Sequence, residues 1–195
     1  MPLAPKAAAP ENNLTRIEVV GAILHRPVSL KPRPQQMPFL DLLSPDRVHT
    51  NFKATGKGDL LQRLSVLLAA DTSESGLILD ALGAREALGS TGLGRGVAIP
   101  HGRIEGLSKA RAAFVRLASP LEFDAIDGQP VDLVAALAVP AQFNDQHLKL
   151  LGELAEIFSD AEMTNALREA ADGSALHAKL AEFAGTRLRD SAWTD

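Results

Sequence analysis

The sequence has no cysteine and no tyrosine, and it has a single tryptophan. Without cysteine the chain can form no disulfide, no thiolate nucleophile and no cysteine-ligated zinc or iron–sulfur site. Few aromatic rings argue against binding nucleic acid by base stacking. A net charge of −4, from 20 Lys and Arg against 24 Asp and Glu, argues against a broad basic field. No apolar run approaches the roughly 20 residues of a membrane span. We expect a cytoplasmic protein without nucleic-acid binding or membrane insertion.

Proline is unevenly distributed along the 195 residues, because 7 of the 12 prolines lie in the first 40. Such a composition is typical of a segment that does not form a packed core. We therefore divide the chain into a flexible, Pro-rich N-terminal extension over residues 1–40, one compact domain over residues 41–184, and a C-terminal tail over residues 185–195. Hydrophobic residues make up 46% of the sequence, which is enough for a core in the central domain.

The central domain alternates between helical and strand periodicity. Apolar residues at helical spacing predict helices over 59–70, 74–88, 145–158, about 161–171 and about 174–184. Short apolar segments predict strands over 97–99, 110–117 and 131–139. The last of these is apolar apart from Asp132 and ends at Pro140, which is typical of a strand buried on both faces. Two helices, then strands, then three helices indicate an α+β domain built in layers.

The segment from residue 85 to residue 103 contains the densest group of chemically useful residues. Its glycines allow backbone N–H groups to approach an anion, and its arginines have the charge to bind phosphate oxygens. These residues are Gly92, Gly94, Gly96 and Gly102, together with Arg85, Arg95 and Arg103. Among them lies His101, and a neutral imidazole is a good nucleophile toward phosphorus. These residue types fit a phosphoryl-accepting histidine in an anion-binding loop. By spacing alone, however, such a loop is more often an ordinary turn, and a single histidine is more often structural or exposed to solvent.

A second histidine begins a predicted helix. Asn144 or Asp145 would cap that helix and place His147 in its first turn, where backbone amides and the helix dipole favour an anion. A metal site is a further alternative. His101 and His147 could bind a metal with one of three carboxylates, Asp124, Asp127 or Asp132, although no tight ligand spacing supports this. We predict no metal and no cofactor.

At these residues the sequence resembles the enzyme IIA proteins of the bacterial phosphoenolpyruvate-dependent phosphotransferase system, of the fructose/mannitol type and in particular the nitrogen-regulatory branch. The resemblance covers about residues 40–184. The segments that match are Arg85-Glu86, Gly89-Ser90-Thr91-Gly92, Gly94, Gly96, Ile99-Pro100-His101-Gly102, residues 123–133 (FDAIDGQPVDL), Val139-Pro140 and His147-Leu148. Residues 123–133 and the following Val-Pro favour the regulatory branch over the sugar-transport relatives.

The resemblance implies a three-layer α/β/α sandwich with a central mixed β-sheet. It also implies that His101 is phosphorylated on its Nε2 (tele) nitrogen by an HPr-like phosphocarrier, that His147 helps to hold the phosphoryl group, and that Arg85 gives electrostatic support. Docking of the carrier would bury an apolar patch, for which Leu93, Val97 and Leu107 are candidates, with a core role as the alternative for each.

In the regulatory branch, the resemblance implies that phosphorylation controls binding to target proteins such as sensor kinases or potassium-transport components. Two alternatives stay open. The chain could pass its phosphoryl group to a sugar-specific IIB domain, or it could be an interaction module whose histidine is never phosphorylated. The sequence leaves the targets, the oligomeric state, the physiological donor and the role of residues 1–40 undetermined.

Overall fold

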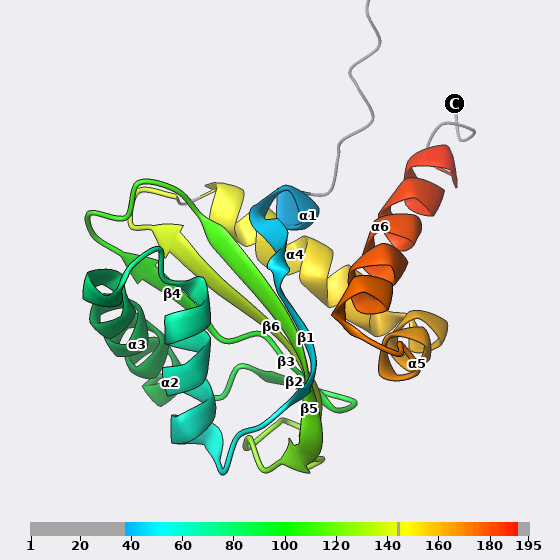
Figure 1. Ribbon diagram of the computed structural model, residues 1–195, viewed down its shortest axis with the longest axis horizontal. Helices are drawn as coiled ribbons and strands as arrows, with labels where there is room; N and C mark the ends of the chain where they lie inside the picture. The colour runs from blue at the N-terminus through cyan, green and yellow to red at the C-terminus, as the bar shows by residue number, and fades with distance from the viewer. Residues whose placement is uncertain (1–37, 144, 191–195) are drawn as a thin grey trace, which may run out of the picture. The chain divides into compact units, whose positions relative to one another are not determined.

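The computed structural model describes residues 38–143 and 145–190. Helices and strands follow in the order α1 (Pro38–Leu42), β1 (Leu43–Phe52), α2 (Lys57–Leu68), α3 (Thr72–Ala87), β2 (Gly92–Gly94), β3 (Val97–Ala98), β4 (His101–Ile104), β5 (Arg111–Leu121), β6 (Val131–Pro140), α4 (Asp145–Ser159), α5 (Ala161–Arg168) and α6 (Gly173–Asp190) (Figure 1).

The six strands form one mixed sheet. Its order is β1-β5-β6-β3-β2, and β4 pairs with β6 beyond the end of β3. Strand β1 is parallel to β5, β5 is antiparallel to β6, both β3 and β4 are parallel to β6, and β2 and β3 form a short antiparallel pair. One long strand, β6, therefore aligns β3 and β4 end to end along one of its edges.

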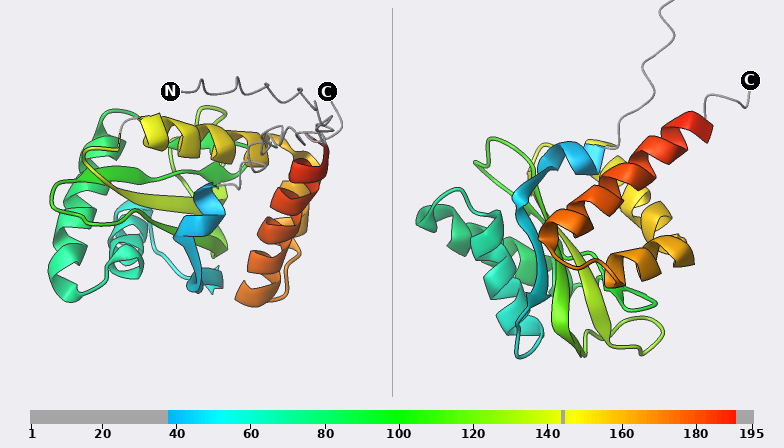
Figure 2. Two further views of the ribbon diagram at one scale, coloured as in Figure 1. Left: turned by 90° about the horizontal axis from the view of Figure 1, so that it is seen from above. Right: turned by 45° about the vertical axis from the view of Figure 1, so that its right-hand side comes forward.

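Helices cover both faces of this sheet (Figures 1 and 2). Helices α2 and α3 pack on one face, and α1, α4, α5 and α6 pack on the other. Alternate residues of β6 belong to the two cores: Leu133, Ala135, Leu137 and Val139 to the first, and Val134, Ala136 and Ala138 to the second. The prediction of a strand buried on both faces is confirmed, and so is the three-layer sandwich with a mixed sheet.

The predicted elements are all present, with ends that shift by a few residues. The largest differences are β5, which continues to Leu121, and α6, which continues to Asp190 and so overlaps the predicted tail. Strand β1 was missed altogether. It is an edge strand that is rich in polar residues and contains Pro45, so it lacks the apolar alternation that indicates a strand. The fold also begins before residue 41, because Phe39 is completely buried.

Residues 1–37 of the predicted extension and residues 191–195 of the predicted tail lie outside the described part of the chain, as does the proposed capping residue Asn144. Among the helices that the structure describes, none combines the length and the apolar character required to cross a bilayer.

Candidate functional site

His101 lies where the strand beside β6 is interrupted. Strand β3 ends at Ala98, Ile99 and Pro100 form the break, and β4 begins at His101. Proline has no N–H group, and the Ile99 N–H donates to the Thr91 carbonyl at 3.0 Å. The Ile99 carbonyl oxygen then lies 2.8 Å from Nδ1 of His101, whose side chain is buried with the residue only 8% exposed. Because a carbonyl can only accept, Nδ1 of His101 holds the proton and Nε2 holds the lone pair.

Arg85 approaches His101 from helix α3. Its Nε donates to Nε2 of His101 at 3.1 Å, and its Nη1 donates to the Gly89 carbonyl at 2.9 Å. This approach depends on Gly102, because a Cβ atom there would lie 2.8 Å from Cβ and 2.9 Å from the carbonyl carbon of Ala81 on α3. The missing side chain thus lets α3 lie directly against β4, and Arg85 reaches the imidazole one helical turn later.

His147 comes from the first turn of α4, as predicted, and its ring lies against that of His101. The two ring centroids are 5.1 Å apart, with an interplanar angle of 52°. His147 is 8% exposed, and its Nδ1 atom is buried without a hydrogen-bond partner. Burial is the main cause that lowers the pKa of His147 to about 4, and the neighbouring charges of His101, Arg103 and Arg85 lower it further.

The pKa of His101 is also lowered. Burial is the main cause, Arg85 contributes in the same direction, and the hydrogen bond to Ile99 and the charge of Glu86 oppose it. A lowered pKa keeps the imidazole neutral at pH 7, so that its Nε2 lone pair is available to an electrophile. The site therefore combines a neutral nucleophile, a second neutral imidazole and the guanidinium groups of Arg85 and Arg103, an arrangement that suits an incoming anion.

The glycines of the predicted phosphate loop have different surroundings. A Cβ at Gly92 would lie 2.8 Å from Cβ of Ala125. Gly94 and Gly96 have positive φ angles of 92° and 77°. A Cβ at Gly94 would lie 3.0 Å from a carboxylate oxygen of Asp127, and one at Gly96 would lie 2.6 Å from Nη2 of Arg168 and 2.7 Å from a carboxylate oxygen of Asp132. The positive φ angles and these close contacts explain both glycines as turn and packing residues, and the anion-binding role stays a prediction.

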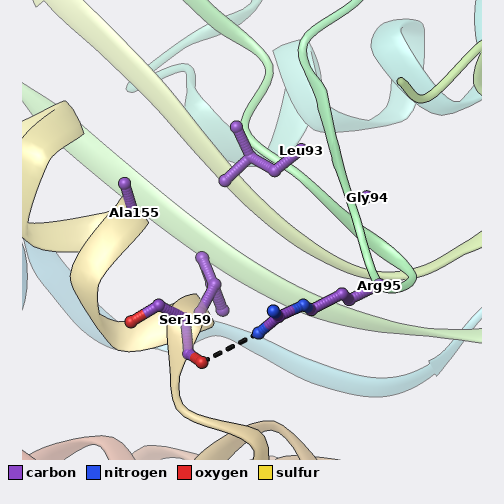
Figure 3. Close-up of a pocket in the computed structure, with 6 residues that line it drawn as sticks. Leu93, Gly94, Arg95, Ala155 and Ser159 are labelled. Atoms are coloured by element: carbon purple, nitrogen blue, oxygen red, sulfur yellow. Dashed lines mark hydrogen bonds between the residues drawn. The ribbon is translucent and has the colours of Figure 1, made fainter. Parts of the chain in front are cut away.

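Arg95, whose charge the sequence also suggested for phosphate binding, is turned toward α4. Its Nη1 donates to the Ser159 carbonyl at 3.0 Å beside an open groove of about 320 Å³ (Figure 3). The groove is lined by Leu93, Gly94, Arg95, Ala155, Phe158 and Ser159. Neither His101 nor His147 belongs to that lining, so Arg95 serves the contact between the β2–β3 turn and α4.

The three carboxylates considered as metal ligands have other partners. Asp132 forms a two-point ion pair with Arg168, Asp124 pairs with Lys57, and Asp127 accepts the backbone N–H groups of Arg95 and Gln129. No group of three His, Asp or Glu side chains able to hold a metal ion occurs within residues 38–143 and 145–190.

The apolar patch predicted near the site is only partly exposed. Leu93 is 44% exposed, whereas Val97 and Leu107 are buried at 0% and 5% and belong to the core. The apolar residues that the sequence analysis did not select, Leu88 and Leu148, are 86% and 68% exposed. Leu88 directly follows α3, the helix that carries Arg85, and Leu148 directly follows His147. These two leucines are therefore the better candidates for a contact surface.

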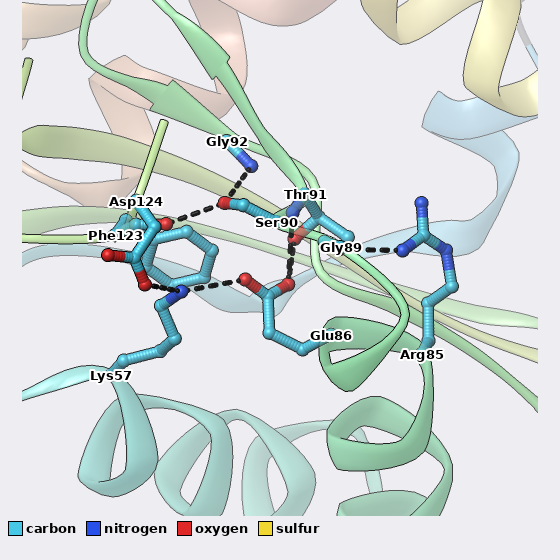
Figure 4. Close-up of polar contacts among 9 residues, drawn as sticks. All are labelled: Lys57, Arg85, Glu86, Gly89, Ser90, Thr91, Gly92, Phe123 and Asp124. Atoms are coloured by element: carbon cyan, nitrogen blue, oxygen red, sulfur yellow. Dashed lines mark hydrogen bonds and ion pairs between the residues drawn. The ribbon is translucent and has the colours of Figure 1, made fainter. Parts of the chain in front are cut away.

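Sequence reasoning also missed a polar network behind the site. Glu86 pairs with Lys57 at 3.0 Å and accepts two hydrogen bonds from Thr91 (Figure 4). Glu86 and Thr91 both lie in the segments that resemble the family, but spacing alone gives no sign that their side chains meet. The only available signal was the position of Glu86 directly after Arg85.

Comparison with known proteins agrees with this fold and site. The sequence profile of the family described as "Phosphoenolpyruvate-dependent sugar phosphotransferase system, EIIA 2" matches residues 41–183. The chain belongs to this family of phosphoryl-transfer components.

Within the family, the chain is homologous to nitrogen regulatory proteins. It is 38% identical to that of Bradyrhizobium diazoefficiens over 146 residues, covering 74% of this chain and 95% of the relative. It is 39% identical to that of Escherichia coli over 142 residues, covering 72% and 85%. The crystal structure of the nitrogen regulatory protein IIA-Ntr from Neisseria meningitidis superposes with a TM-score of 0.70 at 36% identity, covering 73% of this chain and 99% of that one.

Proposed function

We propose that His101 accepts a phosphoryl group on Nε2 from an HPr-like phosphocarrier, and that the phosphorylation state of this chain regulates target proteins. The single observation that supports this most directly is the fixed orientation of His101. The Ile99 carbonyl holds the proton on Nδ1, and the lone pair on Nε2 lies next to Arg85. A nucleophile held in one tautomer beside a cation is suited to attack an anionic phosphoryl group.

The proposed transfer is in line between two histidines. A bond forms between Nε2 of His101 and phosphorus while the bond from phosphorus to the carrier's histidine nitrogen breaks, and its electron pair returns to that nitrogen. His101 keeps its Nδ1 proton throughout. In the unphosphorylated protein, Arg85 donates a hydrogen bond to the Nε2 lone pair of His101, which is the lone pair that must attack phosphorus. The guanidinium group therefore has to turn from Nε2 toward the phosphoryl oxygens as transfer begins.

His147 would help to hold the transferred group. Its ring lies 5.1 Å from that of His101 between centroids, which is within reach of a phosphoryl oxygen on Nε2. Its low pKa of about 4 means that it meets the carrier as a neutral ring. A developing negative charge beside it raises that pKa and favours the protonated ring, which donates a stronger, charge-assisted hydrogen bond to the phosphoryl group.

Target regulation follows from the added charge. A phosphoryl group adds about −2 at a surface that also exposes Leu88 and Leu148. A partner that packs on these leucines would therefore distinguish the two states. The relatives named as nitrogen regulatory proteins support a regulatory output, for which sensor kinases and potassium-transport components are the proposed classes of target in the cytoplasm.

Intact-mass measurement tests the proposal. The protein is incubated with phosphoenolpyruvate, enzyme I and an HPr-like carrier, and we expect one acid-labile phosphate. His101→Ala should take none, whereas His177→Ala, a change on helix α6, should be phosphorylated like the wild type. An unmodified wild type, in the presence of a carrier that is itself charged, would contradict the proposal and leave an interaction module.

A second arm separates regulation from sugar transport. The phosphorylated protein is mixed with a purified sugar-specific IIB domain, since a mannitol-type relative has been solved in complex with phosphorylated IIB. We expect transfer to IIB to be at least tenfold slower than transfer from the carrier. Equally fast transfer to IIB would favour the sugar-relay alternative.

A further inference from the structure

Glu86 occupies a position that is unfavourable for a carboxylate unless something compensates. It lies in the last turn of α3, where the helix dipole disfavours negative charge, and its side chain is only 7% exposed. Both of its carboxylate oxygens accept hydrogen bonds: Lys57 Nζ donates at 3.0 Å, Thr91 N–H at 3.0 Å and Thr91 Oγ1 at 2.6 Å (Figure 4). Three donors from two other segments thus converge on one buried carboxylate.

The contacts of Glu86 continue through Thr91 to Nδ1 of His101. Thr91 is 5% exposed, and both its N–H and its hydroxyl donate to Glu86. Its carbonyl accepts the Ile99 N–H at 3.0 Å, and the Ile99 carbonyl accepts the His101 Nδ1 proton at 2.8 Å. Thr91 therefore holds Ile99 through the N–H group of Ile99, and the carbonyl group of the same Ile99 selects the tautomer of His101.

The same segment also reaches Nε2 of His101 by a second route. Gly89, two residues before Thr91, accepts the Arg85 Nη1 hydrogen bond at 2.9 Å, and Arg85 Nε lies 3.1 Å from Nε2 of His101. Ser90, which lies between Gly89 and Thr91 in the sequence, donates a hydrogen bond from its hydroxyl to the Phe123 carbonyl at 2.5 Å. Residues 89–91 thus contact the partners of both ring nitrogens, and Glu86 is the group that anchors Thr91 at the end of that segment.

We propose that Glu86 is a positioning residue for phosphoryl acceptance: by holding Thr91, it keeps His101 in the single tautomer with the proton on Nδ1 and keeps Arg85 beside Nε2. Lys57 supplies the positive charge that pairs with this buried carboxylate. The proposal rests on the proposed phosphorylation of His101, but the tautomer is a property of the unmodified protein and can be measured without any transfer.

The competing explanation is that Glu86 only joins α2, α3 and the segment after α3. In that case its loss would lower stability and leave His101 unchanged. The tautomer of His101 separates the two explanations, because a stabilising contact alone has no effect on which ring nitrogen is protonated. Glu74→Gln is a matched control, since Glu74 is an ion-paired carboxylate near the start of the same helix, with Arg111 as its partner.

The experiment compares the wild type, Glu86→Gln and Glu74→Gln by long-range ¹H–¹⁵N correlation of the histidine rings at pH 7.5, and by the rate of phosphoryl acceptance from the charged carrier. We expect His101 of the wild type and of Glu74→Gln to be protonated on Nδ1 alone. Glu86→Gln has one acceptor oxygen where Lys57 and Thr91 use two, so its NH2 group must face one of these donors. It should show a mixture of both tautomers and accept the phosphoryl group about tenfold more slowly. Thr91→Val, which keeps the size and the backbone N–H, should shift both readouts in the same direction by a smaller factor.

A Glu86→Gln variant that is folded, keeps the pure Nδ1–H tautomer and reacts at the rate of the wild type would overturn the proposal. If Glu86→Gln does not fold, Thr91→Val decides in its place by the same two readouts. If the wild type accepts no phosphate at all, the proposed function fails, and the tautomer comparison alone still decides whether Glu86 positions His101.

Discussion

Gly102→Ala tests how the contact between α3 and β4 brings Arg85 to His101. The φ angle of Gly102 is not in the left-handed region, so alanine is compatible with the backbone. The new methyl group would nevertheless lie 2.8 Å from Cβ and 2.9 Å from the carbonyl carbon of Ala81, and 3.1 Å from the Leu82 nitrogen. Carbon atoms prefer a separation of about 3.5 Å or more, so α3 has to retreat by about 0.6 Å.

That retreat is enough to break the hydrogen bond from Arg85. Starting from 3.1 Å between Arg85 Nε and His101 Nε2, it gives about 3.7 Å, which is too long for a hydrogen bond. Because α3 carries Arg85, the guanidinium also moves away from the phosphoryl oxygens that it has to bind in the transition state. We therefore expect Gly102→Ala to accept the phosphoryl group about tenfold more slowly, which corresponds to about 1.4 kcal/mol. The crowding should also lower the free energy of unfolding by about 1–3 kcal/mol.

The assay is a rapid-quench measurement of phosphoryl transfer from the charged carrier, with urea unfolding of the same samples. Gly83→Ala is the matched control, because it lies on α3 and a Cβ there would meet nothing within 4 Å. It should keep the rate of the wild type and gain up to about 1 kcal/mol in stability. If Gly102→Ala kept both the rate and the stability of the wild type, the separation of α3 and β4 would not depend on this glycine, and the reasoning would be refuted.

Two further predictions concern stability. The pKa of His147 is about 4 in the folded protein and about 6.5 in the unfolded chain, so the unfolded chain binds the proton more readily. The free energy of unfolding is therefore unaffected by this histidine above about pH 6.5 and decreases as the pH falls toward 4. His147→Leu should therefore be more stable than the wild type by about 2 kcal/mol at pH 4.5 in urea unfolding, yet slower in phosphoryl acceptance; equal pH dependence of both proteins would contradict this. At the start of α6, a Cβ on Gly173 would lie 2.3 Å from the Val48 carbonyl oxygen of β1. Gly173→Ala should cost about 2–3 kcal/mol, whereas Gly152→Ala on α4, with open space around it, should cost nothing, and similar melting temperatures for the two variants would disprove the contact.

Local patterns were sufficient for the layers of the fold but not for its edge. The run Val131–Val139, apolar except for Asp132, predicted a strand buried on both faces because residues 133–139 have to fit between two helical layers. Strand β1 escaped prediction because an edge strand is half exposed and tolerates polar residues and Pro45. Its position depends on pairing with β5, whose paired residues lie 65 to 69 positions later in the chain, and no local pattern contains that information.

The candidate site divides in a similar way. The sequence pointed to His101, His147 and Arg85, and the structure brings these three side chains together. The sequence also indicated that the glycines lack side chains for a structural reason. It could not distinguish a glycine that leaves room for a bound anion from one that leaves room for a neighbouring helix or side chain. Gly102 admits helix α3, and Gly96 lies against Asp132. The role of Glu86 depends on a contact with Thr91 across the end of a helix, which becomes visible only in three dimensions.

The break at Ile99–Pro100 has a consequence for how a phosphorylated state would be recognised. His101 is the first residue of β4, which pairs with β6, and its ring is hydrogen-bonded to the carbonyl group of Ile99, so the residue has little freedom to move when its charge changes. A signal produced here is therefore expected to be local: the outline of the domain stays the same, and the electrostatic potential of one face reverses. Partners would distinguish the two states by the charge of this face and not by its shape. The difference in binding affinity between the two states should therefore become smaller as the salt concentration rises.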